Sequence, residues 1–571
     1  MRGAPPRLPI IPRKWRRSPD SPEGWRLVSG GVAPVAIAAE PAPLESSVEP
    51  LDRPLHVLTM EELAWGVILL WTVVTRFFGL GLSTLSARAA ARALFAYDLA
   101  NGTNEAVGGL HPYSVGWAQM AQAAVFAAAG ADDFTARVIQ VVAGCLLVGV
   151  ALASRRQIGR AGALALGLML ALSPTLAYLT RAGSDGIVAD GAAMLAVVAF
   201  MRLRQLPTRG RAALLGVIAG LMLGAGTVGG VIGLALLLSA GIAGLIAALT
   251  TKHPYLAARV WLKRYGGCVD AAVFAGSAVC LAIQWAVGGP FDHIPTRLAA
   301  WPAPSMVRLG HAIDALALPA GFYEFAIVAG VVVGLVAVVL TPRGSGRGGF
   351  TLLWTVVTFA LCLSLPLAVE EKVLALMPPA ALLGGIGIEY LYRSSGWASI
   401  RWPLLALLIL SAYVQLMINF IYPAPNPAEP PWTRHANLYW SDGATTLDLP
   451  MRAALLERQI PPLDATVFCA GEWTSVLRWY LRGFRPVQNA DHARLLVLTG
   501  QDGHPSPDRV DYAERWEAQP NRLTWHHALR YLLRLEAWGA LTSETATFQV
   551  RPPVVPMSNP ATVVIPPPPA P

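Results

Sequence analysis

Long apolar stretches, nearly free of charged residues, recur through the middle of the chain and restrict its possible folds. An α-helix of about 20 apolar residues spans the hydrocarbon core of a bilayer. Only 14% of the 571 residues are charged, and the mean hydropathy is +0.48, whereas soluble proteins carry about 25% charged residues. The pattern therefore predicts a multi-pass membrane protein.

The net charge of +9 does not point to nucleic acid. The basic residues stand at the ends of apolar stretches, where they set the orientation of a chain in its membrane. The five cysteines form no CxxC motif and no Cys/His cluster, so the sequence predicts neither a metal site nor a disulfide framework. We expect membrane lipid as a partner, no nucleic acid and no cofactor.

Apolar length predicts about eleven membrane spans. The first runs from about Glu62 to Gly81, and the others lie near residues 135–153, 162–180, 186–203, 211–227, 229–250, 267–288, 321–341, 350–368, 373–392 and 402–422. The connections RRQIGR, RLRQLPTRGR, KHPYLAARVWLKR, RGSGR and YRSSGWASIR are all basic. If the N-terminal tail is cytoplasmic, every one of them is cytoplasmic too, as the positive-inside rule requires.

This count holds only if Pro112–Gly130 does not cross the membrane, because a span there would move RRQIGR to the outer side. We expect it to form a helix at the outer interface, with Tyr113 and Trp117 at headgroup level. The first outer loop then extends over residues 82–134.

Composition divides the chain into four parts. Residues 1–56 are rich in Pro and Arg and predict a disordered cytoplasmic tail, and residues 552–571 predict a Pro-rich disordered tail. Residues 57–422 form the all-α membrane domain. Residues 423–551 have an ordinary polar and apolar mixture, with DATVFCA and ARLLVLTG as expected strands and EWTSVLRWYLRG as an expected helix between them. They predict a small α/β domain outside the plasma membrane.

Polar residues gather at the outer ends of the spans. Asp132 and Asp133 precede the second span, Arg181 and Asp185 follow the third, and Glu370, Glu371 and Lys372 lie between two later spans. Charges at membrane depth are costly and usually face a cavity or a partner. Each group also has a purely structural explanation: a helix cap for the first, a local i,i+4 pair for the second and solvated loop charge for the third.

The segment LSTLSARAAARALFAYDLANG, residues 82–102, places Arg88 and Arg92 one helical turn apart just after the first span. Such a pair suits a site for a glycolipid phosphate, because arginine binds phosphate in bidentate fashion. It equally suits the basic stripe of an interfacial helix that binds anionic headgroups.

Several stretches together resemble the GT-C glycosyltransferase superfamily. They are RFFGLGLSTLSARAAARALFAYDLANG, His111, AGADDFTAR, LALSPTLAYLTRAGSD and EEK. Within the superfamily they are most similar to a prokaryotic membrane family described as flippase activity-associated in N-glycosylation pathways. That family is related to the protein O-mannosyltransferases and aminoarabinose transferases. The resemblance covers roughly residues 62–395 and continues weakly through WYLRGF and LRYLLRLEAWG.

The resemblance implies a GT-C-like membrane fold and a hexosyltransferase that uses a polyprenyl-phosphate-linked sugar. The lipid tail would lie between spans, an acidic residue of the first outer loop would act as general base, and no metal is usually needed. The resemblance does not identify the sugar or its glycan or protein acceptor. The candidate catalytic residues are Asp133 and Asp185. The candidates for binding the substrate or its lipid phosphate are Arg88, Arg92, His111, Arg137, Arg181, Glu371 and Lys372.

Two positions depart from the family pattern. The first acidic positions of relatives fall on Arg88 and Ala89, and a Lys–Glu pair falls on Val228 and Gly229. Arginine stays protonated in proteins, so Arg88 cannot act as a base. The alternative is therefore a non-catalytic glycolipid-binding or translocation-associated protein. A solute transporter fits less well, because the chain shows no internal repeat with matched broken helices.

Overall fold

The fold of the protein is taken from a computed structural model. It describes residues 59–82, 85–102, 116–251, 254–287, 324–341, 346–365, 367, 369–395, 397–417, 448–460, 465–470, 474–499, 509–517 and 540–551.

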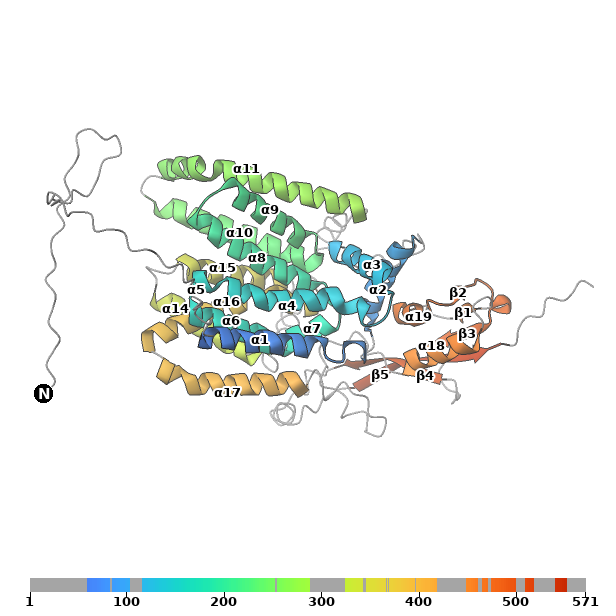
Figure 1. The fold of residues 1–571 in the computed structure, drawn as a ribbon. Coiled ribbons are helices and arrows are strands. Elements are labelled where there is room, and N and C mark those ends of the chain that lie inside the picture. The colour runs from blue at the N-terminus through green and yellow to red at the C-terminus, as the bar shows by residue number, and fades with distance from the viewer. Residues whose placement is uncertain are drawn as a thin grey trace, which may run out of the picture. The chain divides into compact units, whose positions relative to one another are not determined.

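Helices that run side by side form a bundle (Figure 1). They are α1 (Met60–Phe77), α4 (Val138–Ala153), α6 (Arg160–Leu172), α7 (Pro174–Arg181), α8 (Gly186–Gln205), α9 (Arg209–Leu223), α10 (Thr227–Thr250), α11 (Pro254–Val287), α14 (Phe325–Leu340), α15 (Gly346–Ser364), α16 (Val369–Ser395) and α17 (Trp397–Leu416). Within the described residues, five helices are long and apolar enough to cross a membrane, or six if the bent pair α6–α7 is one span. The chain is thus a multi-pass membrane protein.

One expected loop is helical. The sequence predicts that the basic stretch KHPYLAARVWLKR connects two spans, yet α11 begins at Pro254 and includes most of this stretch. Proline is favoured in the first turn of a helix, where its missing N–H costs nothing. The basic residues therefore extend the span as a continuous helix.

Basic connections share one end of the bundle. Arg155 and Arg160 form ion pairs with Glu61 at the start of α1, at 3.7 and 3.5 Å. Arg202, in the last turn of α8, donates to the carbonyl oxygen of Ala153 at 3.2 Å. The short helix α5 (Arg155–Ile158) marks this end, away from the sheet (Figure 1). These two basic connections thus lie side by side at one end of the bundle.

A break separates α6 from α7, which meet at an angle of 53°. Pro174 occupies the first turn of α7, and Ser173 caps that helix by accepting from the backbone N–H of Leu176. The buried carboxylate of Glu324, at the start of α14, accepts from Ser173 Oγ at 2.7 Å and from the Thr175 N–H at 2.9 Å. A helix N-terminus carries partial positive charge, which a carboxylate stabilises.

Small residues allow close helix contacts. Where α10 begins, a Cβ atom added at Gly229 would lie 1.9 Å from the carbonyl oxygen of Met222 in α9. The adjacent Gly230 has nothing within 4 Å of such an atom. The approach of α9 to α10 therefore requires glycine at position 229 but not at position 230.

Helices α2 (Ala87–Asn101) and α3 (Trp117–Ala129) lie at the other end of the bundle, toward the sheet (Figure 1). Helix α3 has 13 residues, or about 20 Å, which is too short to cross a hydrocarbon core of about 30 Å. Its first residue, Trp117, donates from the backbone to Gly224 at 3.2 Å and from Nε1 to Leu221 at 2.8 Å. These bonds attach α3 to the end of α9.

The C-terminal part contains a five-stranded sheet of order β2-β1-β3-β5-β4. Its elements are α18 (Asp448–Gln459), β1 (Thr466–Ala470), α19 (Ser475–Tyr480), β2 (Arg485–Pro486), β3 (Leu495–Thr499), β4 (Arg509–Glu517) and β5 (Ala540–Val550). Strand β1 is parallel to β2 and β3, whereas β5 is antiparallel to β3 and β4. DATVFCA and ARLLVLTG supply β1 and β3, with α19 between them, as the sequence predicts.

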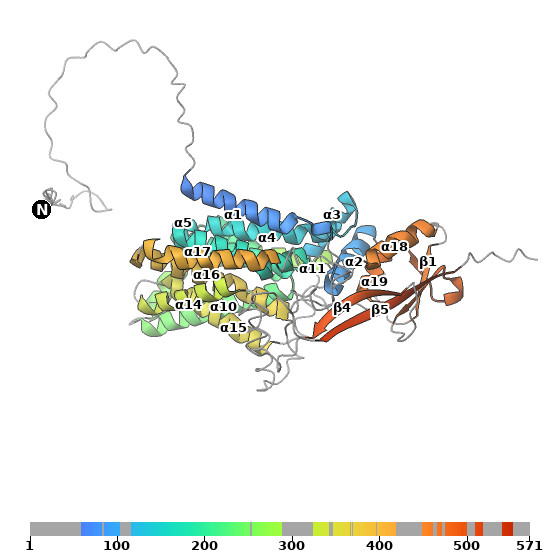
Figure 2. The same cartoon turned by 90° about the horizontal axis from the view of Figure 1, so that it is seen from below.

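Helix α2 also belongs to the core of this C-terminal domain. Its alanines Ala90 and Ala93 are buried in one apolar cluster with Leu456, Trp479 and Phe548 of the domain. Seen from below, α2 lies between the bundle and α19 (Figure 2). One short helix therefore contacts both parts of the protein.

Candidate functional site

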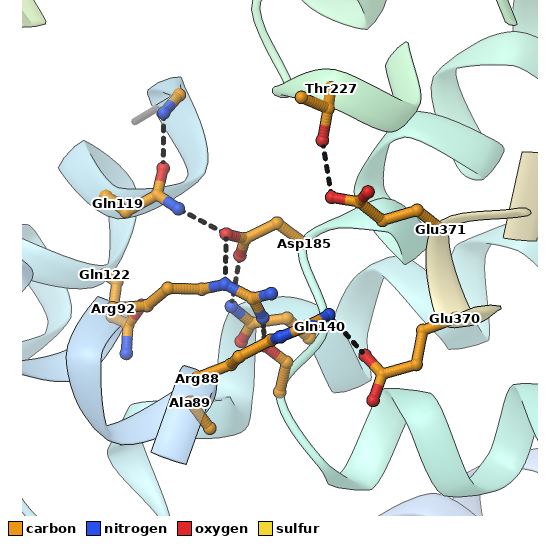
Figure 3. A network of polar contacts seen from close by, with 12 residues as sticks. Arg88, Ala89, Arg92, Gln119, Gln122, Gln140, Asp185, Thr227, Glu370 and Glu371 are labelled. Carbon is orange, nitrogen blue, oxygen red and sulfur yellow. Dashed lines mark hydrogen bonds and ion pairs between the residues drawn. The ribbon is translucent and has the colours of Figure 1, made fainter. Parts of the chain in front are cut away.

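The candidate site is built around α2. Ser86 caps its N-terminus, alanines provide its helix propensity, and Gly102 ends it in the left-handed region at φ 66°. Arg88 and Arg92 extend from this helix toward the bundle (Figure 3). The predicted helix with two arginines one turn apart is thus present, and both side chains are partly buried.

Asp185 is the centre of the polar network in Figure 3. Its Oδ2 atom lies 3.3 Å from Arg92 Nε and also accepts from Gln119 Nε2, while Oδ1 accepts from Gln140 Nε2 at 2.9 Å. Arg92 donates in addition to the Gly183 carbonyl at 2.8 Å. Two more elements, α3 and α4, therefore converge on the carboxylate that precedes α8. The sequence left open a local ion pair between Arg181 and Asp185. In the structure the ion-pair partner of Asp185 is Arg92 of α2.

The first turn of α16 supplies the other acidic groups. Arg88 Nη1 lies 3.8 Å from Glu370 Oε2. Glu371 accepts from Thr227 Oγ1 at 2.8 Å, at the start of α10. The Lys372 side chain is buried. Arg88, Arg92, Asp185 and Glu371 thus lie in one neighbourhood, and its arginines are already paired with carboxylates.

Asp133 has a different surrounding. Its Oδ1 accepts from Trp479 Nε1 at 2.8 Å and its Oδ2 from the Tyr480 hydroxyl at 2.9 Å. Its neighbour Asp132 accepts from the Thr135 backbone N–H at 2.6 Å. The capping explanation therefore fits Asp132, while both oxygens of Asp133 contact the C-terminal domain.

Two further candidate arginines bind main-chain oxygens near the end of α1. Arg137 Nη1 donates to the carbonyl of Leu80 at 2.6 Å. Arg181 Nη1 donates to the carbonyls of Phe78 and Thr75, at 2.5 and 3.3 Å. Arg137 is fully buried and Arg181 partly so. These bonds attach both guanidinium groups to the main chain at the end of α1.

The candidate His111 lies outside the described residues. In the part of the chain that the structure describes, no group of three or more His, Cys, Asp and Glu side chains is placed to hold a metal ion.

Sequence reasoning missed the buried amides of this site. Gln119 and Gln140 orient Asp185, and Gln122 donates to the Ala136 carbonyl at 2.8 Å. It also missed Asp190, which is fully buried in α8 and whose carboxyl oxygens have no hydrogen-bond partner among the described residues. The sequence did contain a signal for these residues. Polar and ionisable side chains are rare inside apolar helices, and where they occur they usually belong to a functional site.

Comparison with known proteins gives a match at the level of structure. No family model matches the chain, and no curated protein sequence matches it significantly. The structure of ArnT from Cupriavidus metallidurans bound to undecaprenyl phosphate is similar, with a TM-score of 0.53 at 14% identity over 76% of this chain and 93% of that one. Its apo form gives the same TM-score and identity over 77% and 94%.

An oligosaccharyltransferase from Archaeoglobus fulgidus is less similar, with a TM-score of 0.43 at 12% identity over 76% of this chain and 65% of that one. This likeness is too weak to bear on the fold. The match to ArnT extends over nearly the whole of that protein and does not single out a member within the superfamily. The chain therefore has the GT-C fold, the architecture of the GT-C superfamily of membrane glycosyltransferases.

Proposed function

We propose that the chain is an integral membrane glycosyltransferase-like protein that handles a polyprenyl-phosphate-linked sugar at the outer face of the plasma membrane. The observation that carries the proposal is the pair of arginines on α2, held against Asp185 and Glu370 at one end of a GT-C bundle. Guanidinium groups bind phosphate in bidentate fashion. The similar ArnT structure contains undecaprenyl phosphate, which supports a ligand of that class.

A second candidate is a non-catalytic protein that binds the glycolipid or assists its translocation. Arg88 occupies the position where the resemblance expects an acid, and the resemblance's other acidic position is Gly229. Asp185 accepts hydrogen bonds through both oxygens and pairs with Arg92, so protein groups already occupy the carboxylate that a general base would need free. These two observations favour binding without transfer. Sugar transfer by the purified protein from a polyprenyl-phosphate donor, abolished by Asp185→Asn, would select the enzyme.

Arg88→Ala is expected to weaken binding of undecaprenyl phosphate by about tenfold or more, because a hydrogen bond to a charged group contributes roughly 1.5–3 kcal/mol. The measurement is a titration of the lipid into protein in nanodiscs, followed by native mass spectrometry. Arg155→Ala is the matched control, since Arg155 forms an ion pair of similar length, 3.7 Å, at the other end of the bundle. If Arg88→Ala binds undecaprenyl phosphate as tightly as the unmodified protein does, Arg88 does not bind the lipid phosphate. The two arginines would then be explained only as the basic stripe of an interfacial helix.

We also propose that the N-terminus is cytoplasmic and the C-terminal domain lies outside. Cysteines introduced at Met451, 58% exposed in α18, and at Arg160, whose side chain is 84% exposed, give the test. A membrane-impermeant maleimide is expected to label Met451→Cys in intact cells and Arg160→Cys only after lysis. The opposite pattern would reverse the orientation and place α2 on the cytoplasmic side.

A further inference from the structure

The contact between Asp133 and α19 joins two distant parts of the chain. Trp479 and Tyr480 donate to the two carboxylate oxygens of Asp133 at 2.8 and 2.9 Å. The Trp479 side chain is fully buried. Each carboxylate oxygen of Asp133 therefore accepts a hydrogen bond from the C-terminal domain.

Tyr480 extends this contact to the start of α2. Its hydroxyl oxygen accepts from the backbone N–H of Leu85 at 2.9 Å, one residue before the cap Ser86. Burial, and then the negative charge of Asp133, raise the pKa of Tyr480. The hydroxyl consequently stays protonated at neutral pH and can donate to Asp133 while it accepts from Leu85.

Arg482 adds a second attachment beside the first. It donates to the carbonyls of Ala131 at 2.5 Å and Trp479 at 2.7 Å. Its guanidinium carbon also lies 4.1 Å from the centre of the Trp479 ring, a distance typical of a cation–π contact. The segment before Asp133 and helix α19 are thus held together at two points.

Helix α2 is consequently fixed from both sides. Its alanines are buried against the C-terminal domain, and Arg88 and Arg92 reach Glu370 and Asp185 of the bundle. We infer that Asp133, Trp479 and Tyr480 are positioning residues through which the C-terminal domain sets the place of α2 and, with it, of the two arginines. This inference rests on the proposed function, since it takes Arg88 and Arg92 as the ligand-binding groups.

Tyr480→Phe tests the inference in the full-length protein in nanodiscs, with undecaprenyl phosphate as the probe. It removes one hydroxyl that makes two hydrogen bonds, so the dissociation constant is expected to rise by about threefold to tenfold. In an Arg88→Ala, Arg92→Ala background, the same change is expected to have no further effect. An equal effect in both backgrounds would overturn the inference, because Tyr480 would then act on another part of the protein. Tyr392→Phe, at a tyrosine of α16 that is 44% exposed, is the matched control.

Hydrogen–deuterium exchange supplies a measurement that needs no ligand. Tyr480→Phe and Asp133→Asn are expected to increase amide exchange in peptides covering α2 and to leave peptides of α8 unchanged. If the unmodified protein fails to bind the lipid but α2 responds in this way, the proposed function fails and the positioning contact stands. If the lipid binds and neither affinity nor α2 exchange changes, the positioning role is overturned. Exchange that rises equally in α2 and α8 would also overturn it, because the residues would then stabilise the fold in general.

Discussion

Asp185→Ala is expected to destabilise the protein by up to about 3–5 kcal/mol, because breaking one side of a largely buried ion pair leaves the other charge uncompensated. The substitution removes the partner of Arg92 and the acceptor for the amides of Gln119 and Gln140. Thermal unfolding in nanodiscs measures the effect, and undecaprenyl phosphate binding is expected to fall with it.

Asp491→Ala is the control for this experiment. Its side chain is 84% exposed, so the change is expected to stay within about 0.5 kcal/mol. Asp185→Asn retains one carbonyl acceptor. Its loss of stability is therefore expected to lie between those of Asp185→Ala and Asp491→Ala. A melting temperature of Asp185→Ala equal to that of the unmodified protein would show that the network in Figure 3 contributes nothing to the fold.

Gly229→Ala is expected to be strongly destabilising, while Gly230→Ala is expected to be neutral or stabilising. A Cβ atom at Gly229 would lie 1.9 Å from the Met222 carbonyl, whereas one at Gly230 would meet nothing within 4 Å. Overpacking costs about 1–3 kcal/mol or more, and replacing a helical glycine by alanine without a clash gains about 0.5–1 kcal/mol. Two adjacent, chemically identical substitutions therefore have opposite expected signs.

The same pair bears on the family resemblance, which places an acidic residue at Gly229. Gly229→Glu is expected to disrupt the contact of α9 with α10 and not to restore a catalytic group. The measurement is the unfolding temperature of each variant beside the matching Gly230 variant. Unfolding of Gly229→Ala at or above the temperature of Gly230→Ala would mean that α9 and α10 are less closely packed than the structure has them.

Periodicity and apolar length were sufficient for the local elements. They predict α2, β1, α19 and β3, and a helix for every apolar stretch, because these elements follow from local propensity and burial. The break before Pro174 was not predicted, although Ser173 and Pro174 together form a common start of a helix. An apolar run by itself does not show where its helix bends.

Partners in space could not be read from the sequence. Asp133 meets Trp479 and Tyr480 more than 340 residues away in the chain, and no local pattern connects them. Arg181 and Asp185 have the spacing of a helical pair, yet Asp185 pairs with Arg92 across the fold. The chemical types at the site were thus recognisable, whereas their pairing depends on packing between helices.

The carboxylate of Glu324 has a consequence for biogenesis. Ser173 and Thr175 are synthesised about 150 residues earlier, and they meet Glu324 only when α14 arrives. Until then the N-terminus of α7 lacks its acceptor inside an apolar environment, where unpaired peptide groups cost several kcal/mol each. A chain that ends before α14 is therefore expected to retain a defect in its first half, and insertion of the early helices alone cannot complete their packing.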